Sequence, residues 1–242
     1  MKRLVILLLS LMVFSCQNQN EEIPFVKIEQ FGSYNSLVFN GDPDAQIALT
    51  EYAKLKNFYA LGVLEDEGGD LTIINSKVFN SSLSNQHEDE SSPFDQKASF
   101  FVSSVVELWD TVSIKQTFRD LDSIEDFILK SAEERDIDSD RPFPFVLHGV
   151  VKKLDWYSWE SRPSEEESSL DESELNREGI KKIQGEVVQV LGFFDKDNLR
   201  EIGKGDDQTN MNFTTKNGQL SGHVDDLIID EKMILKLPKR NF

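Results

Sequence analysis

The sequence predicts an α+β fold that is dominated by sheet, with two β-rich halves and a few helices. Short segments rich in Val, Ile and Phe recur along the chain with partial alternation, as in half-buried strands. Only two segments carry apolar residues at helical spacing. A long acidic stretch at 161–178 separates a front half with both helices from a strand-rich back half.

The elements follow from these patterns in chain order. We expect strands at 24–29, 36–40, 71–75, 98–108, 143–152, 183–194, 211–215, 223–230 and 233–237. A first helix is predicted over 45–56 from its apolar spacing. A second begins near Asp122 and Ser123, which supply an N-cap acid or hydroxyl before the apolar positions Phe127 and Ile128.

The first residues form a secretory signal. Lys2 and Arg3 precede an apolar run over 4–14, and the small residue Ser15 follows it. The run is shorter than the roughly 20 apolar residues that a membrane-spanning helix needs. We therefore expect 1–15 to be a signal peptide.

The end of this signal resembles the lipobox of bacterial lipoproteins. Residues 13–16 read Val-Phe-Ser-Cys, and in a lipobox the cysteine is lipid-modified and becomes the mature first residue. The resemblance implies that Cys16 carries lipid, that 16–24 is a polar tether, and that the protein sits in the cell envelope, on the periplasmic face or cell surface. Several acyl chains suffice for stable anchoring. The alternative is an ordinary signal peptide with a chance cysteine.

Composition excludes several classes of function. Cys16 is the single cysteine, so the remaining chain forms no disulfide. The net charge of −18 becomes about −20 once Lys2 and Arg3 are removed, and such a surface repels nucleic acid and anionic headgroups. We expect one folded unit with a front half at 25–160 and a back half at 179–242, which together are large enough to bury a core.

The acidic stretch is most simply a solvated loop. Residues 164–173 read Ser-Glu-Glu-Glu-Ser-Ser-Leu-Asp-Glu-Ser, with little apolar content. Calcium binding is the alternative, but the run lacks the spaced Asp or Asn ligands and the turn glycine of a calcium loop.

One constellation in the back half has the spacing of a metal site. Asn210 and Asn212 lie two apart, so in a strand their side chains share a face, and a neighbouring strand would supply His223. Histidine at all three positions would make a three-ligand zinc site with an open position. Only His223 is a histidine here.

Several segments resemble, in order, the alpha-acetolactate decarboxylase family. The family's Gly-Leu-Gly, Gly-Glu and Lys-Val-Tyr segments correspond to 58–62 and 69–79, its middle strand to 143–149, its Gly-x-x-Val-Gly-Phe region to 185–193, its His-x-His-Phe to 210–213, and its Gly-His-Val to 222–225. Together they cover most of 25–237. The resemblance implies the sheet-dominated decarboxylase fold and a homodimer.

The resemblance also implies a chemistry. In the family three histidines hold zinc, which binds the keto and hydroxyl oxygens of 2-acetolactate and stabilises the enediolate formed as carbon dioxide leaves. An acidic side chain and an arginine deliver the proton and orient the substrate, and the product is acetoin.

At several positions where the family has a functional residue, this sequence has a different one. The zinc positions hold Asn210 and Asn212, whose neutral amide oxygens bind zinc poorly. The family's glutamate corresponds to Asp70, which is either catalytic or simply a turn residue after two glycines. The family's arginine falls near 156–158, where no arginine stands, and Arg162 lies a few residues further on.

A mixed site is a second interpretation of the same segment. Asp225 lies two residues after His223 and would share its strand face, so these side chains and the asparagine oxygens could hold a harder, weakly bound divalent cation. Alternatively His223 and Asp225 bond to each other or to backbone. The other histidines, His87 and His148, are predicted to be solvated and structural, respectively.

Two functions follow. The first is a membrane-anchored lipoprotein whose decarboxylase-like domain is catalytically impaired or inactive and serves as a binding or structural module. The second is a metal-dependent decarboxylase that converts 2-acetolactate or a related keto acid to acetoin. Export favours the first, because acetolactate is a cytoplasmic metabolite. The expected partners are the membrane, through the anchor, and a small keto-acid ligand.

Overall fold

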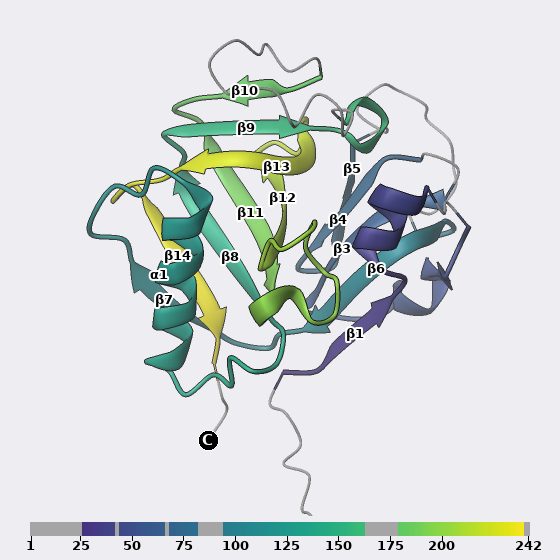
Figure 1. The fold of residues 1–242 in the computed structure, drawn as a ribbon, viewed down its shortest axis with the longest axis horizontal. Coiled ribbons are helices and arrows are strands. Elements are labelled where there is room, and N and C mark those ends of the chain that lie inside the picture. Colours follow the sequence, from purple (N-terminus) through teal and green to yellow (C-terminus); the bar gives the residue numbers. More distant parts are fainter. Residues whose placement is uncertain (1–25, 42–43, 66–67, 82–93, 163–178, 240–242) are drawn as a thin grey trace, which may run out of the picture.

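The computed structural model describes residues 26–41, 44–65, 68–81, 94–162 and 179–239, which form two antiparallel sheets (Figure 1). The first sheet has the order β1-β6-β3-β4-β5, and β2 pairs with β6. Its strands are β1 (Ile28–Phe31), β2 (Ile47–Ala48), β3 (Phe58–Leu64), β4 (Asp70–Ile74), β5 (Lys77–Asn80) and β6 (Lys97–Val105).

The second sheet has eight strands in the order β10-β9-β13-β12-β11-β8-β14-β7. Its members are β7 (Trp109–Ser113), β8 (Phe143–Val150), β9 (Lys153–Tyr157), β10 (Lys181–Ile183), β11 (Val187–Phe194), β12 (Thr209–Thr215), β13 (Ser221–Ile228) and β14 (Met233–Pro238). The prediction of a sheet-dominated α+β fold with few helices is therefore confirmed.

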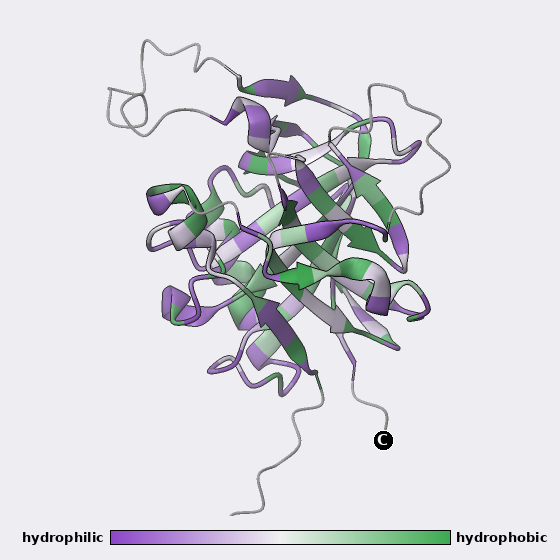
Figure 2. Cartoon of the chain, turned by 90° about the vertical axis from the view of Figure 1, so that its right-hand side faces the viewer, coloured by the Kyte–Doolittle hydropathy of each residue, from purple (hydrophilic) through white to green (hydrophobic). Residues whose placement is uncertain are grey.

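Successive side chains along each strand point to opposite faces of the second sheet. One face packs against α1 (Leu121–Glu133), which lies in front of β7 and β14 in Figure 1. Phe145, Leu147, Phe213 and Leu235 are fully buried there. Colouring by hydropathy shows hydrophobic residues along the strands and hydrophilic residues on many of the loops (Figure 2).

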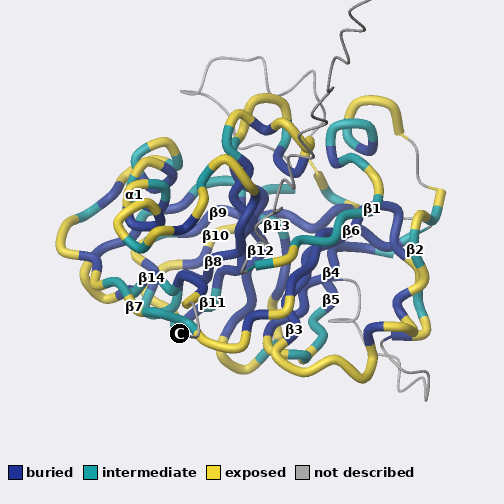
Figure 3. The backbone as a smooth tube through the Cα atoms, turned by 90° about the horizontal axis from the view of Figure 1, so that it is seen from below, coloured by how far each residue is buried: buried dark blue, intermediate teal, exposed yellow. Residues whose placement is uncertain are grey.

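The opposite face of the second sheet packs against the first sheet. Leu61 and Phe100 of the first sheet and Leu191 and Phe193 of the second share one buried cluster. Strands β3, β4 and β5 lie against β11, β12 and β13 across this layer. Figure 3 shows β3, β4 and β12 as buried strands at the centre, with exposed residues on the surrounding loops. The inter-sheet layer also contains every candidate site residue of β12.

Short segments from the front half of the chain cover the outer face of the first sheet. The 3₁₀ helix Leu49–Tyr52 packs on Phe58, Leu71 and Phe101. Burial on both faces explains why β3 and β4 are apolar throughout, apart from a few polar positions such as Asp70 and Thr72.

The predicted second helix is confirmed. It begins at Leu121 after the N-cap Asp120, whose side chain accepts from the Ser123 backbone N–H at 2.8 Å. The predictions for 36–40 and 45–56 are wrong. Ser36–Asn40 is a π-helical turn, started by Ser33 and ended by Gly41 in the left-handed region. The supposed first helix is β2 followed by the 3₁₀ helix, because Ile47 pairs with Ala98 of β6.

Several predictions fall outside the described ranges. The signal peptide, Cys16 and its tether, His87 and most of the acidic stretch belong there. Within the described ranges, no helix has the length and apolar character needed to cross a membrane.

Candidate functional site

The paired strands β12 and β13 bring the predicted metal-site positions together. Asn212 lies directly opposite His223 in the antiparallel register, and Asn210 is two residues along the same strand. Met211 and Phe213, which alternate with the two asparagines along β12, face the α1 side. Asn210, Asn212 and His223 therefore share the face that meets the first sheet.

The side chain of Asn212 joins the two sheets. Its Nδ2 donates to the Leu71 carbonyl at 3.3 Å and to Thr72 Oγ1 at 3.1 Å, both on β4. A backbone carbonyl only accepts, so the amide group facing Leu71 is the NH2 and Oδ1 faces the other way. Oδ1 lies 3.3 Å from His223 Nδ1, so the ring must carry its proton on Nδ1 and donate.

The side chain of Asn210 forms its hydrogen bond with a different neighbour. Its Nδ2 donates to the Ile202 carbonyl at 2.9 Å, in the loop that precedes β12. Asn210 and Asn212 are both 2% exposed, so these bonds satisfy amides that would otherwise be buried without partners. Both asparagines act as structural hydrogen-bond donors.

The His223 ring is enclosed by two tyrosines. Tyr34 stacks on it with ring centroids 5.6 Å apart and an interplanar angle of 19°, and Tyr157 lies at 5.0 Å, tilted by 44°. The residue as a whole has intermediate exposure, with both tyrosine rings packed against its imidazole. Burial, assisted by the positive charge of Lys204, lowers the His223 pKa to about 3. The imidazole is therefore neutral at physiological pH.

The two tyrosine hydroxyls form a buried polar pair. Burial raises the pKa of Tyr34 and of Tyr157, and the negative charge of Asp70 acts in the same direction on both. The Tyr34 hydroxyl has no partner with full hydrogen-bond geometry, although Tyr157 interacts with it. Both phenols stay protonated across the physiological range.

Asp70 lies at the start of β4 on the same side of the layer. Its Oδ2 accepts from the Trp159 backbone N–H at 2.7 Å and from Ser81 Oγ at 3.4 Å. Burial raises its pKa to about 7 against the effect of the Trp159 bond, and the charge of Glu160 adds to the rise. Asp70 is therefore more than a surface turn residue: it is a buried carboxyl that titrates near neutrality.

Arg162 reaches the rim of the same cluster from the 3₁₀ turn Trp159–Ser161. Its guanidinium lies over the Trp159 ring, 4.1 Å from the centroid, and Nη1 donates to the Trp159 carbonyl at 3.0 Å. Its positive charge opposes the rise in the pKa of Tyr34 that burial causes. Arg162, the arginine that sequence analysis considered for this region, thus lies beside the cluster. It is positioned by a turn rather than by a strand.

The placement of Asp225 depends on a bulge. The register of β13 against β9 shifts between Val224 and Asp226, so strict alternation from His223 does not extend to Asp225. Its charge still raises the pKa of Tyr157. Among the described residues no three His, Cys, Asp or Glu side chains gather closely enough to hold a metal ion.

The donor set at 210, 212 and 223 does not fit zinc. Both asparagine NH2 groups bond to β4 or to the Ile202 loop, and Asn212 Oδ1 already accepts from His223. One imidazole nitrogen, Nε2 of His223, remains as a good zinc donor among these three residues. Zinc bound by Asn212 Oδ1 would displace the hydrogen bond from His223 Nδ1.

Sequence reasoning missed the aromatic enclosure of the site. Tyr157 and Trp159 stand in the run Trp-Tyr-Ser-Trp at 156–159, and this concentration of aromatic residues after a strand was an available signal. Tyr34 gave none, because it reaches His223 from a helical turn far away in sequence.

Among the solved structures that resemble this chain, three cover most of its length as follows. No protein-family model and no curated protein matches the sequence. A Staphylococcus aureus protein of unknown function, described as similar to alpha-acetolactate decarboxylase, has a TM-score of 0.58 at 14% identity and covers 89% of this chain and 85% of its own.

The other two are alpha-acetolactate decarboxylases. The enzyme from Bacillus subtilis strain 168 has a TM-score of 0.62 at 13% identity, covering 88% of this chain and 86% of its own. The enzyme from the subspecies spizizenii has a TM-score of 0.60 at 14% identity, covering 88% and 87%. The chain therefore has the alpha-acetolactate decarboxylase-like fold. At this identity the likeness concerns the fold alone.

Proposed function

We propose that this chain, which has the acetolactate decarboxylase-like fold, is a lipid-anchored envelope protein whose domain binds a ligand or serves a structural role without the decarboxylase reaction. The observation that carries the proposal is the use of Asn210 and Asn212 as hydrogen-bond donors at the zinc-ligand positions that the sequence resemblance assigns. These bonds stabilise the inter-sheet layer and leave a poor donor set for zinc.

The aromatic enclosure supports the same proposal. Tyr34 covers one face of the His223 ring, and it also packs edge-on against Trp159 with centroids 6.0 Å apart. A substrate that approached His223 from this side would have to displace Tyr34, which is 2% exposed. The site is built more for packing than for exchange of substrate and product.

A second function is favoured by one observation. Asp70 is a buried carboxyl with a pKa of about 7, close enough to Tyr34 and Tyr157 to raise the pKa of each. A general acid works best when its pKa lies near the operating pH, and a proton donor of this kind is what a decarboxylated enediolate needs. A decarboxylase acting on 2-acetolactate or a related keto acid is the alternative.

One experiment separates the two functions. Residues 17–242, which contain every described element, are purified, their metal content is measured, and acetoin is assayed after addition of 2-acetolactate and zinc. We expect substoichiometric zinc and no turnover above that of the Asp70→Asn variant. Stoichiometric zinc together with Asp70-dependent acetoin formation would establish the decarboxylase instead.

A double variant tests the alignment of the site. Asn210→His with Asn212→His places three imidazoles on the shared face, and we expect tight zinc binding to appear. A single Asn212→His variant is the matched control. Like the double variant it lacks the bonds from Asn212 to β4, but it has one fewer histidine ligand. Equal zinc affinity of the single and double variants would mean that position 210 is not directed at this site.

The anchor has its own test. Full-length protein is expressed in a bacterial host supplied with a labelled fatty acid, and the membrane fraction is collected. We expect label on the wild-type chain and none on Cys16→Ala, which should leave the membrane fraction. A Cys16→Ala chain that stays with the membrane and keeps its label would refute lipid anchoring at this residue.

A further inference from the structure

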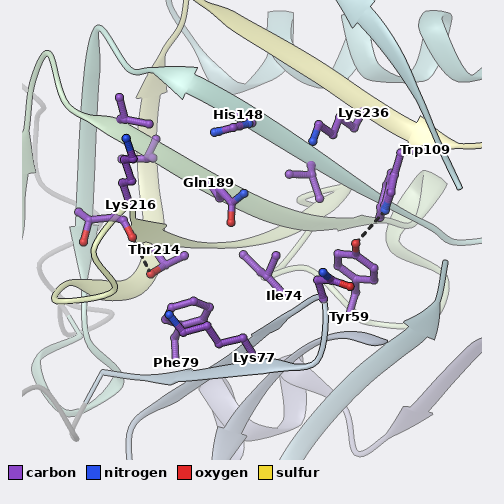
Figure 4. A pocket seen from close by; sticks show the side chains of 15 residues that line it. Tyr59, Ile74, Lys77, Phe79, Trp109, His148, Gln189, Thr214, Lys216 and Lys236 are labelled. Atoms are coloured by element: carbon purple, nitrogen blue, oxygen red, sulfur yellow. Dashed lines mark hydrogen bonds between the residues drawn. The ribbon is translucent and has the colours of Figure 1, made fainter. Parts of the chain in front are cut away.

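A cavity lies in the inter-sheet layer, with Thr214, two residues along β12 from Asn212, in its wall. Its volume is about 390 Å³, within the range of small-molecule sites. Apolar side chains including Ile74, Phe79 and Val146 line part of it, and polar groups line the rest (Figure 4). Asn212 is outside its lining. The Asn212 amide and Ser221 Oγ both bond to Thr72.

The strand register builds the polar wall. Thr214 of β12 lies opposite Gln189 of β11, which lies opposite His148 of β8. These three neighbours form a row across the inner face of the second sheet. The adjacent row runs from Asn212 through Leu191 and Val146 to Lys236. Two apolar residues thus separate the Asn212 cluster from Lys236, which lines the cavity.

Three lysines line this cavity and no carboxylate does. Lys77 comes from β5, Lys216 from the turn after β12, and Lys236 from β14. No ion pair within the described part of the chain involves any of the three. In a chain of net charge −18, with 44 acidic residues, a cavity whose charged lining residues are all lysines is a local reversal of the field.

The turn that carries Lys216 is held against the first sheet. Gly218 has φ +72°, and a Cβ there would lie 3.0 Å from the Phe79 ring. The glycine therefore allows both the left-handed turn and the close approach to β5. Lys77 Nζ lies over the same Phe79 ring, 4.8 Å from its centroid, so the turn and one of the three cations contact the same aromatic side chain.

Neutral donors complete the lining. Trp109 Nε1 donates to the Tyr59 hydroxyl at 2.9 Å, which leaves the Tyr59 O–H proton for another acceptor. Burial and the neighbouring Lys236 lower the pKa of His148, so this histidine is a neutral hydrogen-bonding group. It was predicted to be structural, and the structure places it in the cavity wall.

We infer that this cavity binds a small organic carboxylate, with the carboxylate at the lysines and an apolar body against Ile74, Phe79 and Trp109. The inference rests on the proposed binding role and gives it a ligand class and a place outside the Asn212 cluster. Ammonium groups and an available hydroxyl proton stabilise a carboxylate, while the aromatic and aliphatic wall contributes apolar contact.

The test uses 3-phenylpropionate, its uncharged amide and inorganic phosphate as probes in calorimetric titrations of residues 17–242. We expect saturable binding of 3-phenylpropionate with a dissociation constant of about 1 mM or tighter. Lys216→Gln with Lys236→Gln should weaken it at least about tenfold. The charge-matched control, Lys54→Gln with Lys182→Gln, should leave it unchanged, since both lysines are exposed and lie outside the lining.

Three results would overturn the inference: equal affinity for the acid and its amide, binding of phosphate in place of the carboxylate, or no difference between the two double variants. If the Lys216 and Lys236 variant does not fold, Lys216→Gln alone is measured, because that side chain is exposed. Acetoin formation is assayed on the same samples. Turnover with lysine-dependent binding would refute the non-catalytic role and keep the site, whereas neither turnover nor binding would refute the site alone.

Discussion

Asn212 of β12 donates its side-chain NH2 to Thr72 Oγ1 of β4 at 3.1 Å, so a residue at a predicted metal-ligand position links the two sheets. The same NH2 reaches the Leu71 carbonyl at 3.3 Å. An imidazole at this position would hold metal, whereas the amide supplies two donor protons to buried acceptors. Asn212 therefore contributes to the packing of the two sheets against each other.

This role predicts a stability cost for removing the amide. Asn212→Ala leaves Thr72 and the Leu71 carbonyl without this donor, and the free energy of unfolding should fall by about 1–3 kcal/mol. Urea denaturation measures it as a lower midpoint with an unchanged slope. Asn40→Ala, the same truncation at an exposed position, serves as the control. Equal effects of the two changes would contradict the link.

Asp70 predicts a pH dependence of stability. Its pKa rises from 3.8 to about 7 on folding, so the folded state holds a proton that the unfolded state releases. Stability from this group is complete below about pH 4 and is lost as the pH rises towards 7. Asp70→Asn keeps an acceptor for the Trp159 N–H but has no charge to bury.

The variant should therefore be more stable than wild type at pH 8, by about 1–4 kcal/mol, and the difference should shrink at pH 5. Thermal unfolding across pH 4–8 measures both curves. Glu125, whose pKa is also raised to about 7 by burial, gives the comparison. Glu125→Gln should reduce the pH dependence of stability by an amount that is independent of Asp70. A variant at Asp70 with the wild-type slope would show that its carboxyl is ionised in the folded state.

Tyr34 predicts the titration of His223. Stacking of Tyr34 on the ring contributes to the burial that lowers the His223 pKa to about 3. Tyr34→Ala exposes one ring face, so the pKa should rise towards 6.5, as followed by NMR of the imidazole protons. Tyr34→Phe keeps the ring and removes a hydroxyl without a full partner, so the pKa should stay low and stability should not fall. A low pKa in both variants would assign the burial to other neighbours.

Gly192 predicts a packing limit in β11. A Cβ there would lie 2.1 Å from Cζ of the Phe145 ring, the residue directly opposite on β8. Gly192→Ala should lower the free energy of unfolding by about 1–3 kcal/mol through overpacking. Adding Phe145→Leu should recover part of the loss, whereas Phe145→Leu alone should be destabilising. Additive losses in the double variant would mean that the two residues do not compete for one space.

The sequence was informative where local pattern and burial agree. Alternation in 211–215 and 223–230 predicted strands, and the two-residue spacing of Asn210 and Asn212 correctly put both on one face. It was misleading at 45–56, where helical spacing describes a strand and a single 3₁₀ turn. There the hydrogen bonds to β6 outweigh local helix propensity, and no local pattern contains a distant pairing partner.

By itself, the sequence determined the sheet-rich class, the shared face of the two asparagines and the net negative charge. The tertiary structure alone decided what those residues do. It placed Thr72 beneath Asn212, Tyr34 over His223 and Trp159 against Asp70. Hydrogen-bond partners and local dielectric depend on residues 140 positions away for Thr72 and Asn212 and 189 positions away for Tyr34 and His223, because packing two sheets face to face brings distant segments into one layer.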